Sequence, residues 1–141
     1  MFVDGIQCVG GRFGLTMPSD LRTLKKLGRI LREEVSEVEQ WDNYKATRKV
    51  IHFEGMAVGL IEFSNDPARL IVTAADLTSP TWNRISPLKL RLPVSEAALV
   101  LGEHAQSDPD LLRTYQSEND SVKIHSTNGI VTRVSYACYS G

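Results

Sequence analysis

The sequence has little cysteine and no long apolar run. Its two cysteines, Cys8 and Cys138, fit neither a metal motif nor a CxxC pair. They could pair only if the two ends of the chain meet in the fold, and we expect instead two reduced thiols in a cytoplasmic protein. No stretch approaches the roughly 18 apolar residues that a transmembrane helix needs. The N-terminus also lacks the basic and apolar regions of a signal peptide.

The chain lacks an excess of either charge. The formal net charge is −1, which gives no electrostatic reason to expect a nucleic acid or a membrane surface as partner. The 42% of apolar residues is ordinary for a globular protein, and 141 residues can enclose a sizeable core.

Recognisable catalytic and metal-binding motifs are also missing. No histidine has a second histidine or a cysteine two to four residues further on, so the usual metal spacing is absent; the histidines are His52, His104 and His125. Residues 10–14 contain a G-x-x-G but no phosphate-binding pattern, and they predict a turn. We expect no catalytic residue, no cofactor and no metal. The alternative is a small hydrolase that brings His52 and His125 together in one cleft.

The sequence does contain a pattern that comes twice. Residues 50–63 match residues 122–136 when His52 is set over His125, and no gap is needed. In the second copy Asn128-Gly129 favours a two-residue hairpin turn, because both turn positions need positive φ. Apolar and polar residues alternate after this turn, which is typical of a strand.

The repeat extends toward the N-terminus of each copy. A leucine-x-apolar-proline motif occurs at 15–18 and again at 90–93, and a short helical pattern that contains Leu-Gly follows each motif, at 27–28 and 101–102. We interpret the chain as two copies of one unit.

The predicted fold is therefore α+β, with two similar helix-plus-antiparallel-sheet units in tandem, packed as one compact domain. The first unit spans residues 1–77 and the second spans 78–141. The first helix should open at residues 18–20 and end near Gly28, although Leu31, Val35 and Val38 keep a helical spacing that favours a longer helix. The second helix should cover 93–101, capped by Ser95. The β-prone run at 69–75 predicts a central strand.

One stretch concentrates negative charge, and an aromatic residue lies within it. The segment contains Glu33, Glu34, Glu37, Glu39, Trp41 and Asp42. It is either an ordinary solvated face or a surface for a basic partner. Trp82, in the proline-containing loop that should join the two units, is either a lid on the core or an exposed anchor. Tryptophan is favoured at interfaces, so we predict partner binding by these seven residues.

The doubled unit resembles known bacterial modules. The order of strand, proline, helix ending in Leu-Gly, aromatic and hairpin is similar to the small α+β modules of outer-membrane assembly lipoproteins. Its doubled form resembles the β-lactamase inhibitor proteins. The Trp41-Asp42 pair also resembles small proteins linked to bacterial toxin systems. The lipoprotein cysteine of the first group is missing, and the disulfides of the inhibitors are not evident.

This resemblance implies a binding protein that presents an antiparallel sheet and needs no cofactor. We expect a non-enzymatic inhibitor, most concretely a cytoplasmic immunity protein that neutralises a bacterial toxin or effector. A small envelope-associated assembly or binding protein is the alternative.

Overall fold

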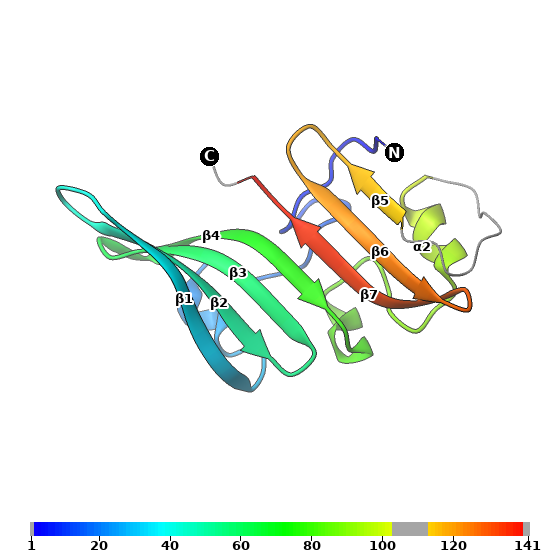
Figure 1. The fold of residues 1–141 in the computed structure, drawn as a ribbon, viewed down its shortest axis with the longest axis horizontal. Helices are drawn as coiled ribbons and strands as arrows, with labels where there is room; N and C mark the ends of the chain where they lie inside the picture. The colour runs from blue at the N-terminus through cyan, green and yellow to red at the C-terminus, as the bar shows by residue number, and fades with distance from the viewer. Residues whose placement is uncertain (1, 103–112, 140–141) are drawn as a thin grey trace.

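The computed structural model describes residues 2–102 and 113–139. Its framework is one antiparallel sheet of seven strands in the order β1-β2-β3-β4-β7-β6-β5 (Figure 1). The strands are β1 (Ile30–Gln40), β2 (Lys45–Phe53), β3 (Met56–Phe63), β4 (Asp66–Leu77), β5 (Arg113–Gln116), β6 (Ser121–Thr127) and β7 (Ile130–Ala137). The predicted antiparallel sheet and compact domain are confirmed.

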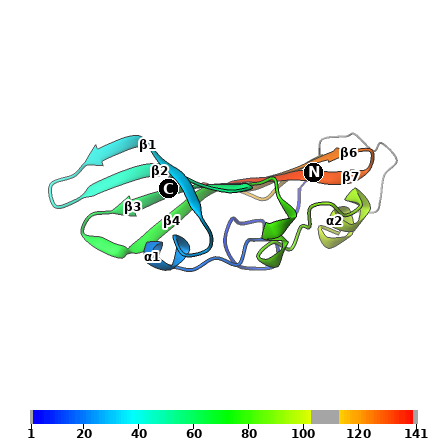
Figure 2. The same cartoon turned by 90° about the horizontal axis from the view of Figure 1, so that it is seen from below.

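All helical segments lie on one side of the sheet, together with the N-terminal segment (Figure 2). They are α1 (Leu21–Leu24), the 3-10 helix η1 (Pro80–Arg84) and α2 (Val94–Val100). No described helix or strand covers the opposite face of the sheet, which we call the open face. No helix among the described residues is long and apolar enough to cross a membrane.

The core lies between the sheet and this one-sided cover. Side chains alternate between the two faces of a strand, and in β6 and β7 the covered positions are apolar, as at Val122, Ile124 and Val134. Leu15 and Leu90, the leucines of the two leucine-x-apolar-proline motifs, are fully buried beneath the sheet.

The prediction of two similar helix-plus-sheet units in tandem is not supported. Residues 1–77 contribute four strands and a helix of one turn, whereas residues 78–141 contribute three strands and a seven-residue α2. The junction is a direct pairing of β4 with β7, from Ala74 opposite Ala137 to Leu77 opposite Val134. One sheet therefore runs through both halves.

The helix predicted from residues 18–20 to Gly28 is wrong beyond its first turn. Asp20 does cap it, because the amide of Thr23 donates to Asp20 Oδ1 at 2.8 Å. The helix ends at Leu24, the only residue of that turn that is buried. The longer helix through Val35 and Val38 is also wrong, because those residues pair with β2 in the strand β1.

Two other local predictions are confirmed. Asn128 and Gly129 have φ values of 52° and 78° and join β6 to β7 as a hairpin. The predicted strand at 69–75 lies within β4, the fourth of the seven strands. The helix predicted for 93–101 is α2, but the predicted cap is wrong: Pro93 occupies the N-cap position, and no side chain caps the helix.

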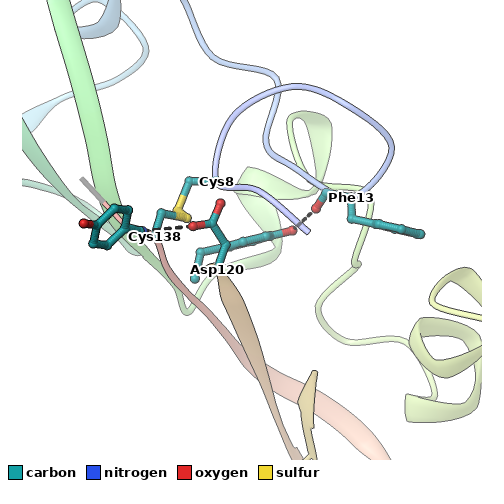
Figure 3. Close-up of a disulfide and its surroundings, with 6 residues drawn as sticks. Cys8, Phe13, Asp120 and Cys138 are labelled. Carbon is teal, nitrogen blue, oxygen red and sulfur yellow. Dashed lines mark hydrogen bonds between the residues drawn. A yellow bond between two sulfur atoms is a disulfide. The ribbon is translucent and has the colours of Figure 1, made fainter. Parts of the chain in front are cut away.

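The prediction of free thiols is wrong. The two ends of the chain do meet, and Cys8 and Cys138 form a disulfide with their Cα atoms 6.1 Å apart (Figure 3). The N-terminal segment passes beneath the end of β7, where the Tyr136 hydroxyl donates to the Phe13 carbonyl at 2.6 Å. Burial raises the pKa of this hydroxyl above its usual value. The neighbouring backbone is fixed as well, because the Cys138 amide donates to the Thr73 carbonyl.

Candidate partner-binding surface

The two edges of the sheet differ in how well they are protected. At one edge β5 is four residues long, and its Gln116 carbonyl accepts a hydrogen bond of 2.8 Å from the amide of Val3. At the other edge β1 is eleven residues long, and every residue after Ile30 is exposed. Among the described residues, only β2 pairs with β1. An exposed edge strand is a template for another chain, so β1 is the natural starting point for a binding surface.

The two faces of β1 carry different side chains. Glu34, Glu37 and Glu39 lie opposite Val50, Arg48 and Ala46 of β2, on the open face of the sheet. The other face carries Glu33 and Gln40 together with Val35 and Val38, and the two valines are 60% and 53% exposed. The predicted acidic segment is therefore an edge strand with one acidic side and one side that carries two exposed valines.

Much of the predicted negative charge is neutralised by neighbouring cations. Glu33 lies 3.2 Å from Lys25 Nζ and 3.3 Å from Lys49 Nζ. Burial works against its charged form, but the hydrogen bonds from these lysines outweigh burial and lower the pKa of Glu33. Glu37 lies 3.8 Å from Arg48. The negative potential of this segment is therefore weaker than five unpaired carboxylates would produce.

Glu34 is paired as well. Its Oε1 lies 2.6 Å from His52 Nε2 and 3.5 Å from Arg32, and the hydrogen bond with His52 lowers the pKa of Glu34. Glu39 and Asp42 differ from the other three carboxylates, because neither has an ion pair within the described part of the chain. The uncompensated charge is thus at the Trp41 end of β1.

Trp41 is the exposed member of an aromatic cluster at this end of the sheet, whose other members are partly buried. Its side chain is 53% exposed and stacks on Tyr44, with ring centroids 6.2 Å apart. Tyr44 in turn contacts Phe63 at 6.0 Å. The guanidinium of Arg69 lies 4.3 Å from the Phe63 ring centroid, and no described carboxylate forms an ion pair with it.

These side chains border a hollow of about 270 Å³ on the open face, which we call the aromatic hollow. Its floor is apolar, its rim carries both charges, and β1, β2, β3 and β4 all contribute to it. It is lined by Glu39, Trp41, Tyr44, Ala46, Arg48, Ile61, Phe63, Arg69 and Ile71. Of the predicted site residues, the structure brings Glu39 and Trp41 together here.

Most residues of the aromatic hollow were not predicted from the sequence. Tyr44 and Phe63 were not predicted as partner residues, and neither were Arg48 and Arg69. Of these four, only Tyr44 belongs to the hairpin that follows β1. There the Trp41 amide donates to the Tyr44 carbonyl at 2.8 Å and closes the turn. Two aromatic residues that flank an Asp-Asn turn indicate a hairpin, and that pattern could have placed Trp41 and Tyr44 side by side.

Trp82 is not part of any exposed surface in the described structure. It is 2% exposed, its Nε1 donates to the Glu54 carbonyl at 2.8 Å, and its ring meets Phe53 edge-on at 5.5 Å. The prediction of an exposed anchor is wrong for this residue. The alternative of a lid on the core is confirmed.

The two histidines do not share a cleft. Both lie on the open face, but β3, β4 and β7 separate β2 with His52 from β6 with His125. Four strand spacings amount to about 19 Å. His104 lies outside the described residues. The arrangement proposed for a hydrolase with His52 and His125 is therefore not formed.

A serine and a carboxylate do meet near His125, but they are not arranged for nucleophilic catalysis. The Ser135 hydroxyl donates to Asp76 Oδ1 at 2.6 Å, and Arg133 holds both oxygens of the same carboxylate at 2.7 and 2.9 Å. A serine nucleophile needs a base to accept its proton, whereas Asp76 is committed to Arg133. Burial opposes the charged form of Asp76, but these hydrogen bonds outweigh burial and lower its pKa. We interpret this group as a clasp between β4 and β7.

A second hollow, of about 330 Å³, lies beside the disulfide. Its one carboxylate, Asp120, already accepts a hydrogen bond from the Tyr139 amide at 2.9 Å (Figure 3). This hollow has a single charged side chain, Asp120, and a single aromatic residue, Tyr139, so the aromatic hollow, with its aromatic cluster and charges of both signs, is the better candidate site.

Comparison with known proteins gives no match: no protein-family model, no curated protein and no solved structure matches the chain.

Proposed function

We propose that this chain is a non-enzymatic inhibitor that binds a protein partner through the Trp41 end of β1 and the aromatic hollow. The observation that carries the proposal is the exposed Trp41, stacked on the half-buried Tyr44, beside two carboxylates without an ion pair among the described residues, Glu39 on the open face and Asp42 in the following turn. Exposed aromatic side chains supply large contact area at an interface, and nearby charges accelerate the encounter with a basic partner.

The partner class we propose is a bacterial toxin or effector, so that the chain would act as an immunity protein. Such a protein works by occupying its partner, and it needs a recognition surface but no catalytic group.

A second candidate is an envelope-associated binding protein, and one observation favours it. The disulfide between Cys8 and Cys138 is typical of proteins that work in an oxidising compartment. This favours a location outside the cytoplasm over the cytoplasmic location predicted from the sequence. Both candidates use the same surface, and cell fractionation together with the identity of the partner separates them.

The proposal is tested by reversing the two uncompensated carboxylates. We expect Glu39→Lys with Asp42→Lys to slow association with the protein encoded by the adjacent gene about tenfold at low salt, because charges that attract are replaced by charges that repel. The difference should shrink at high salt, where exposed charges are screened. Glu33 and Glu34 are left unchanged, because they hold Lys25, Lys49 and His52 in place.

The matched control reverses two exposed carboxylates at the protected edge, with Asp4→Lys and Glu118→Lys. This control has the same net charge as the test variant. We expect it to associate at nearly the rate of the unmodified chain. Equal slowing by both pairs would mean that only net charge matters and would remove the Trp41 end from the interface. Stopped-flow or surface-based kinetics at two salt concentrations measures the difference.

A further inference from the structure

The outer edge of β1 has the backbone groups needed to accept another strand. Hydrogen-bonded and non-bonded pairs alternate along an antiparallel ladder, and the Trp41 amide bonds inward to Tyr44. By that alternation, Glu39 also faces β2, whereas the amides of Gln40 and Val38 face outward. No described segment bonds to this outer edge.

The side chains of β1 define what kind of strand would fit. Beside Glu37 to Gln40, an added strand would place alternate residues on the two faces of the sheet, each beside a β1 residue of the same face. A register shift between Val35 and Glu37 interrupts this alternation. On the open face its neighbours would be Glu37, which lies 3.8 Å from Arg48, and Glu39, which has no ion pair among the described residues and favours lysine or arginine. On the covered side its neighbours would be Val35 and Val38, both more than half exposed, which favour apolar residues.

A second copy of this chain fits the edge poorly. Two β1 strands paired antiparallel would set the open-face side chains of both copies against one another, and these are three carboxylates and one arginine: Glu34, Glu37, Glu39 and Arg32. Like charges directly opposite each other destabilise a sheet. Glu34 and Glu37 already have ion-pair partners, so it is Glu39 that disfavours a second acidic strand and favours a basic one.

We propose that β1 binds its partner by strand addition, and that the bound segment is an extended peptide with alternating basic and apolar side chains. Main-chain hydrogen bonds along β1 would supply affinity, and the alternating side chains would supply specificity. The aromatic hollow, beside the end of the same strand, would take a side chain of the partner next to this segment. This inference rests on the proposed function, because it specifies how the same partner is held.

The test uses a variant that removes one outward amide and leaves the β1–β2 ladder intact. Proline lacks the N–H group and is tolerated on an edge strand where that group faces solvent. The variant is Val38→Pro, and its matched control is Val38→Thr, which keeps the amide and the branched shape. The probe is a ten-residue peptide of alternating lysine and valine, compared with a peptide of the same composition in which the valines are contiguous.

We expect the alternating peptide to bind the unmodified chain at least about tenfold more tightly than the contiguous peptide, because only one face of an added strand meets Val35 and Val38. Val38→Pro should weaken binding about tenfold through the lost hydrogen bond and the clash of the ring, whereas Val38→Thr should stay close to the unmodified chain. Fluorescence anisotropy gives the affinities, and circular dichroism confirms that both variants fold.

Amide hydrogen exchange of the unmodified chain supplies a readout that needs no variant. Strand addition predicts slower exchange at Gln40 and Val38 when the alternating peptide is bound. Equal affinity for the two peptides, or unchanged exchange at both amides, would overturn the proposal. So would sedimentation data showing a dimer that Val38→Pro converts to a monomer, because a second copy would then be the occupant.

The two proposals fail in different ways. If the adjacent-gene protein binds in a manner that depends on Glu39 and Asp42 but tolerates Val38→Pro, the surface stands and strand addition is wrong. If its binding ignores the charge reversal at the Trp41 end, the proposed function itself is wrong.

Discussion

Removing the disulfide should lower the free energy of unfolding by about 3–5 kcal/mol, because it closes a very long loop in the unfolded chain. Cys8 and Cys138 are 130 residues apart in sequence, so the bond restricts almost the whole unfolded ensemble. The variant is Cys8→Ser with Cys138→Ser, and urea unfolding followed by circular dichroism measures the change.

The control for this prediction is a reducing agent. Reduction should destabilise the unmodified chain by a similar amount and leave the double serine variant unaffected. A thiol titration of the unfolded, unreduced protein should find no reactive cysteine. Two reactive thiols in protein purified under oxidising conditions would contradict the disulfide and restore the prediction of free thiols.

The second large effect distinguishes the two tryptophans. Trp82→Ala should destabilise the fold by about 3–5 kcal/mol, because it leaves a cavity against Phe53 and an unsatisfied Glu54 carbonyl. Trp41→Ala should change stability by less than about 1 kcal/mol, because the side chain is mostly exposed.

For the affinity of the partner we expect the reverse, with a larger loss on substitution of Trp41 than of Trp82. Trp41→Ala should weaken the complex more than tenfold if the aromatic cluster is its anchor, while a conservative Trp82→Phe variant that still folds should bind normally. Urea unfolding and an equilibrium binding assay on the same preparations measure both quantities. Equal losses of stability for the two alanine variants would show that Trp41 is part of the core.

The parts of the fold that local chemistry decides could be predicted from the sequence. Asn128-Gly129 adopts positive φ at both positions, as a two-residue hairpin requires. The run from Arg69 to Ala75 forms the middle of β4 because its β-branched residues suit a central strand. The apolar spacing after Pro93 likewise indicated α2.

The incorrect predictions concern segments whose structure depends on contacts with distant parts of the chain. Four glutamates favour a helix over residues 33–39 by propensity, but pairing with β2 makes this segment a strand. The burial of Trp82 depends on a hydrogen bond to Glu54, 28 residues away. The disulfide depends on a path that brings the two ends together, and spacing alone could not reveal it.

The binding surface was predicted in part for the same reason. Glu39 and Trp41 are close in sequence, and the acidic segment is easily seen. Arg48, Phe63 and Arg69 join them only because β2, β3 and β4 lie side by side in register. The residues that pair with three of the five predicted carboxylates lie in β1 and β2, together with Lys25.

The most direct test of the central claim is a hydrogen-exchange footprint of the chain in complex with the protein encoded by the adjacent gene. We predict that binding slows exchange in β1 and in the hairpin from Trp41 to Tyr44, and leaves β5 and α2 unchanged. Protection confined to β5 or α2, or the absence of any complex, would contradict the account.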